Sequence, residues 1–308
     1  MVDRLLVGTR GSKLALAQTK LVLGMLESAD GGVSFEIVPI KTAGDLSPPG
    51  TLNLDGKTAF TGEIEEHLVD EKIDFAVHSM KDLPPIPDDR LTVAATPRRG
   101  DARDALVTTS GEKFAALRKG ARVGTSSARR KAQILAAKKD VEVIELHGNV
   151  ETRLRKLEAE ALDGVVLTAA GLQRLGLGSR ITQVFEPGEM VPAPCQGILA
   201  VQARRGDRKV VALLKKIDDP AARLASECER AFSEALGGDC DVPLGAFASL
   251  GPEGLTAIGV LACPDGSEIV KISATGGRGK AKELGLNLPP RCSLRGAVRS
   301  SGSWKDDQ

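Results

Sequence analysis

Residues 73 to 84 read IDFAVHSMKDLP, which predicts a buried strand that ends in polar and charged side chains. The run 73–77 is apolar, as in a strand covered on both faces. The Pro-Pro pair that follows prevents a regular continuation. Open α/β sheets place their ligand crevice at such a strand end. Asp82, next to Lys81, is therefore either a carboxylate beside a bound substrate or part of a solvated turn, and this stretch alone does not decide which.

The composition is that of a soluble globular protein whose positive and negative charges nearly balance. A chain of 308 residues is long enough for two or three domains. The net charge of +1 and the 3% aromatic content argue against a nucleic-acid partner, which would need a basic surface or stacking platforms. The N-terminus has no apolar signal region and no stretch reaches the length of a membrane span, so we expect a cytoplasmic protein with no membrane partner.

The cysteines do not form a recognisable framework. There are 5 of them, an odd number, and none belongs to a CxxC pair. This pattern argues against a set of disulfides or a zinc site, and we expect no metal. Any functional cysteine must therefore act singly.

The first hundred residues alternate between strand and helix signals, as in an α/β domain. Ser12 is placed to cap the first helix, and Arg10 lies in the turn before it, where a helix N-terminus favours anions. A surface arginine in a loop is the alternative. Residues 41–62 have no period and predict a long mobile loop. The strands and helices predicted here are at 5–7, 13–28, 33–40, 64–71, 73–77 and 91–95.

The segment 104–192 repeats the same strand-turn-helix pattern after a crossing at 97–107. A strand at 122–124 leads into residues 125–139, which predict a polar turn and then an amphipathic helix capped by Thr125, Ser126 or Ser127. Arg129 and Arg130 stand in its first turn, although cations favour the C-terminal end of a helix. The pair suggests an anion-binding site, with a solvated charge pair as the alternative.

The rest of this segment contributes more basic side chains. Strands are predicted at 141–146 and 164–168. Arg153 and Arg155 lie on the helix between them and face different directions, and Arg174 follows the second strand. Two similar α/β units whose polar strand ends face each other predict a cleft between domains.

The last hundred residues begin with a Pro/Gly-rich connector at 187–197. The strand that follows, 198–204, is expected to return to the first domain. A helix at 221–236 ends at two glycines, and the remainder alternates like a small antiparallel sheet. Between them, Cys240 lies in a glycine-rich loop, either as a small buried hydrophobe or as a nucleophile. Nothing in the sequence places His78 or His147 beside it.

Seven motifs stand in the same order as in the hydroxymethylbilane synthase (porphobilinogen deaminase) family, which the chain resembles from residue 5 to about residue 275. They are GTRGSKLALAQ at 8–18, AVHSMKDLP at 76–84, RDAL at 103–106, VGTSSARR at 123–130, GNVETRL at 148–154, AGLQRLGL at 170–177 and LGGDCDVPLG at 236–245.

The resemblance implies a fold and a reaction. The fold is α/β, with two periplasmic-binding-protein-like (type II) domains, 1–98 plus 196–217 and 99–195, and a small α+β domain, 218–308. The reaction joins four molecules of porphobilinogen head to tail with release of ammonia, giving the linear tetrapyrrole hydroxymethylbilane for the biosynthesis of heme, chlorophyll and corrins. A dipyrromethane cofactor is held by a thioether to the loop cysteine, here Cys240. We expect a monomeric transferase.

The residues agree with this chemistry. Each pyrrole carries an acetate and a propionate, so a growing chain needs many cationic partners. Loss of ammonia leaves a cationic azafulvene-type intermediate, which a fixed carboxylate stabilises. The resemblance makes Asp82 that catalytic aspartate. The predicted cofactor-binding residues are Cys240, Lys81, Ser79, Arg129, Arg130, Thr125 and Ser127. The predicted substrate-binding residues are Arg10, Ser12, Arg153, Arg174 and His147.

Four features depart from the family pattern. His147 replaces an arginine and cannot form a bidentate fork with a carboxylate. Asp239 replaces the third glycine before the cysteine, and its charge disfavours a thiolate. Gly62 stands where relatives tend to have lysine. Residues 289–308 have no helical period, so we predict no domain-closing helix there and a less stable small domain. Together these features are compatible with a slow enzyme.

Two other functions fit part of the sequence. A binding protein for anionic small molecules also has two α/β lobes and a cationic cleft, but it needs neither Cys240 nor Asp82. An inactive relative that keeps the fold would explain the four departures. Turnover of porphobilinogen separates the enzyme from both.

Overall fold

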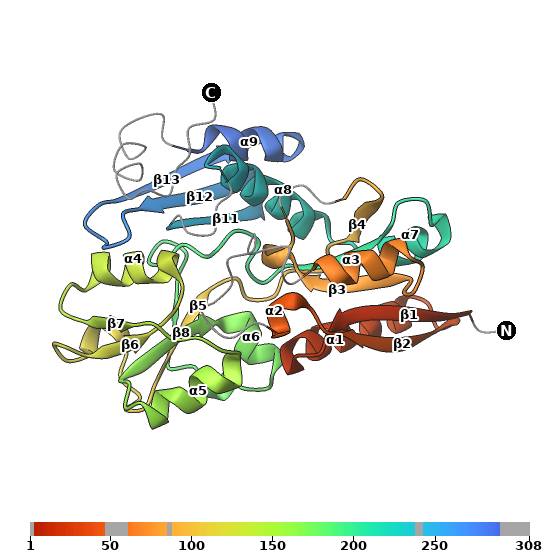
Figure 1. The fold of residues 1–308 in the computed structure, drawn as a ribbon. Coiled ribbons are helices and arrows are strands. Elements are labelled where there is room, and N and C mark those ends of the chain that lie inside the picture. The colour runs from red at the N-terminus through yellow and green to blue at the C-terminus, as the bar shows by residue number, and fades with distance from the viewer. Residues whose placement is uncertain (1–2, 47–60, 85–87, 238–242, 290–308) are drawn as a thin grey trace. The chain divides into compact units, whose positions relative to one another are not determined.

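The computed structural model describes residues 3–46, 61–84, 88–237 and 243–289, in two compact units (Figure 1). Met1–Gly100 and Gly197–Arg223 form the first unit, and Asp101–Gln196 and Leu224–Gln308 form the second. Each contains a five-stranded sheet, and the second also contains a three-stranded sheet. The predicted α/β class is confirmed. The division into three domains stays a prediction.

The sheet of the first unit has the strand order β2-β1-β3-β10-β4. Its first three strands are parallel, whereas β10 is antiparallel to both of its neighbours. The predicted return of the strand at 198–204 to this sheet is therefore confirmed. The elements of this unit are β1 (Asp3–Arg10), α1 (Lys13–Ala29), β2 (Val33–Ile40), α2 (Ala43–Leu46), α3 (Gly62–Val69), β3 (Phe75–Ser79), β4 (Leu91–Ala95), β10 (Leu199–Arg204) and α7 (Arg208–Leu214).

Alternate residues of β3 face opposite sides of this sheet. Phe75 and Val77 belong to the core that α1 and α7 cover, whereas Ala76 belongs to the core under α3. This is the two-residue period of a strand. It places His78 on the α3 side and Ser79 on the α1 side, at the carboxyl end of the strand. The predicted buried strand is confirmed, but it spans Phe75–Ser79 instead of 73–77 and continues through His78 and Ser79, where the sequence predicts a break.

The larger sheet of the second unit repeats this design with the order β7-β6-β8-β5-β9. The strand β5 is antiparallel to β8 and β9, just as β10 is to its neighbours. The elements here are β5 (Asp104–Thr108), β6 (Arg122–Gly124), α4 (Ala128–Ala137), β7 (Glu142–Ile144), α5 (Val150–Ala159), β8 (Gly164–Thr168), α6 (Ala169–Arg174) and β9 (Gln183–Phe185).

The small sheet is antiparallel, as predicted, with the order β11-β12-β13. Its strands are β11 (Leu244–Gly251), β12 (Gly254–Ala262) and β13 (Ile269–Gly276). Two helices, α8 (Pro220–Ala235) and α9 (Ala281–Asn287), cover one face of it (Figure 1). Gly259 lies directly beneath them, since a Cβ there would stand 2.6 Å from the Phe232 ring of α8 and 3.1 Å from Leu288.

Several sequence predictions need correction. The short helix α2 occupies part of 41–62, where only a loop was predicted, because four residues are too few to show a helical period. The strand β5, Asp104–Thr108, begins inside 97–107, for which the sequence predicts only a crossing. By contrast, a predicted cap is confirmed: Ser127, one of the three candidates, is the N-cap of the helix that begins at Ala128. Within the described ranges, none of the helices is long and apolar enough to span a membrane.

Three predictions concern residues outside the described ranges. These are the mobile loop over 47–60, the cysteine loop with Asp239 and Cys240, and the absence of a helix after Pro289. They stay predictions, as does the cleft between the two lobes.

Candidate active site

Asp82 lies just past the carboxyl end of β3, in a one-turn 3-10 helix, Met80–Asp82. Pro84 prevents a regular continuation of the chain after this turn, and Met80 within the turn and Leu83 just after it are both buried. Asp82 itself is half-buried and lines a cavity of about 70 Å³ in the first unit. The cavity is lined by Arg10, Ser12, Leu14, Ala15, Gln18, Thr61, Val77, His78, Ser79 and Asp82.

The cavity is a partly open recess, so its volume does not limit the size of a bound ligand. Polar groups surround it, including a carboxylate, a guanidinium and hydroxyls. The first unit thus supplies a small polar recess at the strand end that the sequence predicted.

Two serines of the recess have partners within the first unit. Ser12 caps α1, accepting a hydrogen bond from the backbone N–H of Ala15 at 3.2 Å. Ser79 accepts one from Nε2 of Gln18 at 3.0 Å, and Gln18 is itself buried. The cap predicted at Ser12 is confirmed. Gln18 was not singled out, because it looks like one more residue on the face of α1.

Arg10 forms an ion pair with Asp45 of α2. Burial raises the pKa of Asp45, but Arg10 and then Thr42 lower it more, so the net shift is downward. The anion that Arg10 meets here is thus a side chain of the same chain. Its role toward a substrate stays a prediction.

His78 is the buried titratable group of this recess. Burial lowers its pKa to about 4, although a hydrogen bond with Gln202 acts in the opposite direction. The imidazole is therefore neutral near pH 7. Its Nε2 has no hydrogen-bond partner among the described residues. Gln202 continues the polar chain by donating to Oε1 of Glu65 at 2.8 Å.

The second unit contains a buried cluster of charges around Asp104, the first residue of β5. Arg129 donates from Nη1 to its Oδ2 at 2.6 Å, and Arg130 donates from Nη2 to its Oδ1 at 2.8 Å. All three side chains are almost completely buried. The alternative of a solvated arginine pair is therefore excluded, because the first turn of α4 packs against the sheet and turns both side chains inward. The anion-binding role of the pair stays a prediction.

The charges in this cluster do not balance. Among the described residues, two guanidinium groups face one carboxylate here, which leaves a net charge of +1. Burial raises the pKa of Asp104, but the positive charges of Arg129 and Arg130 lower it further, so the carboxyl stays ionised. A surplus cation in a low-dielectric interior is costly unless an anion compensates it.

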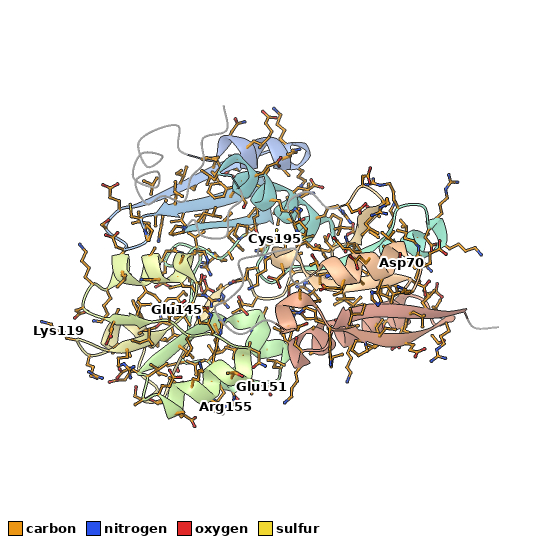
Figure 2. All side chains as sticks on the ribbon, in the orientation of Figure 1. Asp70, Lys119, Glu145, Glu151, Arg155 and Cys195 are labelled. Atoms are coloured by element: carbon orange, nitrogen blue, oxygen red, sulfur yellow. The ribbon has the colours of Figure 1, made fainter. Side chains whose placement is uncertain are left out.

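Two more arginines of the second unit are largely buried. Burial, and then the positive charge of Arg130, lower the pKa of Arg153 to about 10, and burial lowers that of Arg174 to about 10. Both remain protonated at neutral pH. Arg153 donates to the Ser126 hydroxyl at 3.2 Å. Arg155, on the same helix, is exposed, so the predicted divergence of the two side chains is confirmed (Figure 2).

The remaining predicted residues of this unit have local partners. Ser127 caps α4. Thr125 is buried and accepts from the backbone N–H of Ser127 at 3.2 Å. His147 Nε2 lies 2.9 Å from Oε1 of Glu145, a side chain that Figure 2 labels. For these three residues a role in ligand binding stays a prediction.

The connector before residue 197 joins the arginine cluster to the small sheet. Val191 accepts from Nη1 of Arg129 at 2.7 Å, and Pro192 accepts from the backbone N–H of Ala246 in β11 at 2.9 Å. Cys195, beside α8 in Figure 2, donates its backbone N–H to buried Glu229. The strand that follows the cysteine loop therefore begins next to the backbone that holds Arg129.

The structure thus groups the predicted residues in two places. Arg10, Ser12, Ser79 and Asp82 share the recess of the first unit, whereas Arg129 and Arg130 share the cluster of the second. Sequence reasoning missed Asp104, although the RDAL motif contains it. Among the described residues, no group of three or more His, Cys, Asp or Glu side chains is arranged to hold a metal ion.

Comparison with known proteins identifies the family. The model "Porphobilinogen deaminase, dipyromethane cofactor binding domain" matches residues 5–212, and "Porphobilinogen deaminase, C-terminal domain" matches residues 223–290. The porphobilinogen deaminase of Roseiflexus sp. (strain RS-1) is 48% identical over 267 residues, 86% of this chain and 88% of that relative. That of Syntrophotalea carbinolica is 43% identical over 295 residues, 95% of this chain and 93% of that relative.

Among solved structures, the methionine binding protein MetQ is similar with a TM-score of 0.44 and 12% identity, over 77% of this chain and 95% of that one. The family assignment comes from the sequence matches, which cover both the dipyromethane cofactor binding domain and the C-terminal domain. The chain belongs to the porphobilinogen deaminase family.

Proposed function

We propose that this chain is a hydroxymethylbilane synthase, which condenses four porphobilinogen molecules head to tail and releases ammonia at each step. The observation that carries the proposal is the match to both domains of the family over almost the whole chain. The product is the linear tetrapyrrole hydroxymethylbilane. We further propose that the chain works as a cytoplasmic monomer without a nucleic-acid, membrane or metal partner.

The residues of the second unit fit the dipyrromethane cofactor. Its pyrroles carry carboxylates, and the Asp104 cluster has a surplus positive charge. Nε of Arg129 and Nε of Arg153 are buried without a hydrogen-bond partner among the described residues. An anionic group is what such a site requires. When bound, the cofactor supplies the pyrrole carbon to which the first substrate is joined.

We propose Cys240 as the residue that holds the cofactor, in a small domain over 218–308. Arg129, Arg130, Thr125, Ser127, Lys81 and Ser79 are the proposed cofactor-binding residues. Arg10, Ser12, Arg153, Arg174 and His147 are the proposed substrate-binding residues. The arginines bind and orient carboxylates through paired N–H donors.

Asp82 is the proposed catalytic residue. Cleavage of the C–N bond in porphobilinogen releases ammonia and leaves a positive charge on the pyrrole that remains. A carboxylate fixed at the end of β3 stabilises this charge as it develops and accepts a hydrogen bond from the pyrrole N–H. The rigid strand and the buried side chains of Met80 and Leu83 hold the carboxylate in place, so it need not reorganise during the reaction.

The decisive experiment is an intact-mass measurement of the purified protein and of its Cys240→Ser variant. We expect the wild-type mass to exceed the sequence mass by two linked pyrrole units, and the variant to lack this excess. If the wild type has no excess, it is incubated with porphobilinogen. Acquisition of the excess and release of ammonia then support the synthase. A wild-type chain that neither gains mass nor releases ammonia would refute it, in favour of a binding protein or an inactive relative.

A further inference from the structure

Asp104 is a buried carboxylate that none of the proposed roles uses. It accepts hydrogen bonds from Nη1 and Nη2 of Arg129 at 2.6 and 3.2 Å, and from Nε and Nη2 of Arg130 at 3.0 and 2.8 Å. Nε2 of Gln196 donates to the same carboxylate at 3.0 Å. Five donor atoms from two distant parts of the chain thus converge on one side chain.

These contacts leave neither guanidinium free to rotate. Arg129 also donates to the carbonyl of Val191 at 2.7 Å, and Arg130 donates to that of Val166 at 2.8 Å. Each planar group is therefore fixed between Asp104 and a backbone carbonyl. Consecutive residues of a helix point about 100° apart, so a shared partner is needed to bring both groups to one place.

A purely structural role explains only part of this arrangement. One arginine would neutralise one buried carboxylate, yet the chain buries two against Asp104 and places a third, Arg153, close enough to have its pKa lowered by Arg130. Nε of Arg129 is left without a partner among the described residues. Such a cluster is stable when an external anion completes it, which is the property of a binding site.

We propose that Asp104 is a positioning residue that holds the guanidinium groups of Arg129 and Arg130 in the arrangement that binds the carboxylates of the cofactor. This inference rests on the proposed function, because it assigns the anion to the dipyrromethane group. Asp104 does not touch the anion itself. It acts through the two arginines, by fixing their planes and by limiting their surplus charge.

The test compares Asp104→Asn with Asp163→Asn in the full-length chain. Asp163 is a matched control, since it also accepts from an arginine, Arg118, at 3.1 and 3.0 Å. Asp163 lies just before the first residue of β8, whereas Asp104 pairs with Thr168, the last residue of β8. The control residue is therefore at the other end of that strand. Apo-protein of each variant is incubated with porphobilinogen, and intact mass follows the gain of two pyrrole units over time.

We expect Asp104→Asn to load at least about ten-fold more slowly than the wild type, because a neutral amide no longer fixes both guanidinium groups and leaves their positive charges uncompensated. Asp163→Asn should load at the wild-type rate, even if its melting temperature falls as much as that of Asp104→Asn. Wild-type loading by a folded Asp104→Asn chain would overturn the proposal. A wild type that does not load at all would instead refute the proposed function.

If Asp104→Asn does not accumulate in folded form, Asp104→Glu replaces it. This variant keeps the charge but moves it by one methylene, which disturbs the planes of both guanidinium groups. A folded Asp104→Glu chain that loads about ten-fold more slowly supports the positioning role. Loading at the wild-type rate contradicts it.

Discussion

Asp82 and His78 come from the same strand end, but their surroundings differ. Asp82 is half-buried at the rim of the recess, whereas His78 is buried behind it with a pKa of about 4. Asp82 can therefore contact a ligand, whereas burial keeps the His78 imidazole neutral. Single substitutions separate a role in turnover from a role in stability.

Asp82→Asn should lower kcat by about 100-fold or more, because the amide has the same shape but cannot stabilise a positive charge. The measurement is ammonia release from porphobilinogen by cofactor-loaded protein. Asp89→Asn is the control, since Asp89 is an exposed carboxylate of the nearby turn before β4. Equal turnover in the two variants would remove Asp82 from its proposed role.

His78 should make the protein lose stability in mild acid. Its folded pKa of about 4 lies below the ordinary value of 6.5, so below pH 6.5 the unfolded chain binds a proton that the folded chain does not. The free energy of unfolding therefore falls as the pH falls from 6.5 toward 4, by up to about 3 kcal/mol. In His78→Gln this contribution is absent.

The stability difference between wild type and His78→Gln should consequently shift in favour of the variant between about pH 7 and about pH 5. Urea midpoints of both proteins across this range provide the measurement. A difference that stays constant would show that His78 does not carry this proton linkage.

Among the helices, α9 depends on a glycine for its packing, whereas α1 has one that its surroundings do not require. A Cβ at Gly285 would stand 2.1 Å from the carbonyl oxygen of Cys228 in α8, but a Cβ at Gly24 would meet nothing within 4 Å. Alanine favours a helix over glycine by about 0.5–1 kcal/mol. The same substitution should therefore have opposite effects at the two positions.

We expect Gly24→Ala to raise the free energy of unfolding by about 0.5–1 kcal/mol and Gly285→Ala to lower it by about 1–3 kcal/mol. Urea denaturation followed by circular dichroism measures both. Stabilisation by Gly285→Ala would mean that α9 does not pack closely against α8.

Elements with a strong local pattern were predictable from sequence. The strands β2 and β8 have the observed bounds, 33–40 and 164–168, because their apolar runs are bounded by glycine or polar residues. The strand β5 was missed because charged residues precede and begin it, and Asp104 is buried only through arginines 25 and 26 positions away. A pattern of neighbouring residues in the sequence does not predict a contact between side chains that far apart in the chain.

For the whole molecule, the first unit should fold only when both of its chain segments are present. The strand β10 lies between β3 and β4, so a fragment ending at Gly100 lacks the middle of that part of the sheet. The backbone N–H of Gly100 donates to the carbonyl of Gly197 at 3.1 Å, so these two positions are adjacent.

A chain in which a short Gly-Ser linker joins 1–100 to 197–223 should therefore fold on its own, and 1–100 alone should not. Circular dichroism and amide dispersion in NMR spectra distinguish the two outcomes. A folded 1–100 fragment would show that β10 is dispensable for this unit.

The late position of β10 also affects the order of events during synthesis on the ribosome. The strand emerges about 100 residues after β4, whereas the larger sheet of the second unit, β5 to β9, is complete by Phe185. At roughly 5–20 residues per second, β3 and β4 wait about 5–20 s with unpaired edges. The first hundred residues are thus made first, but their sheet is completed only after the larger sheet of the second unit, and during that interval β3 and β4 most need protection by chaperones.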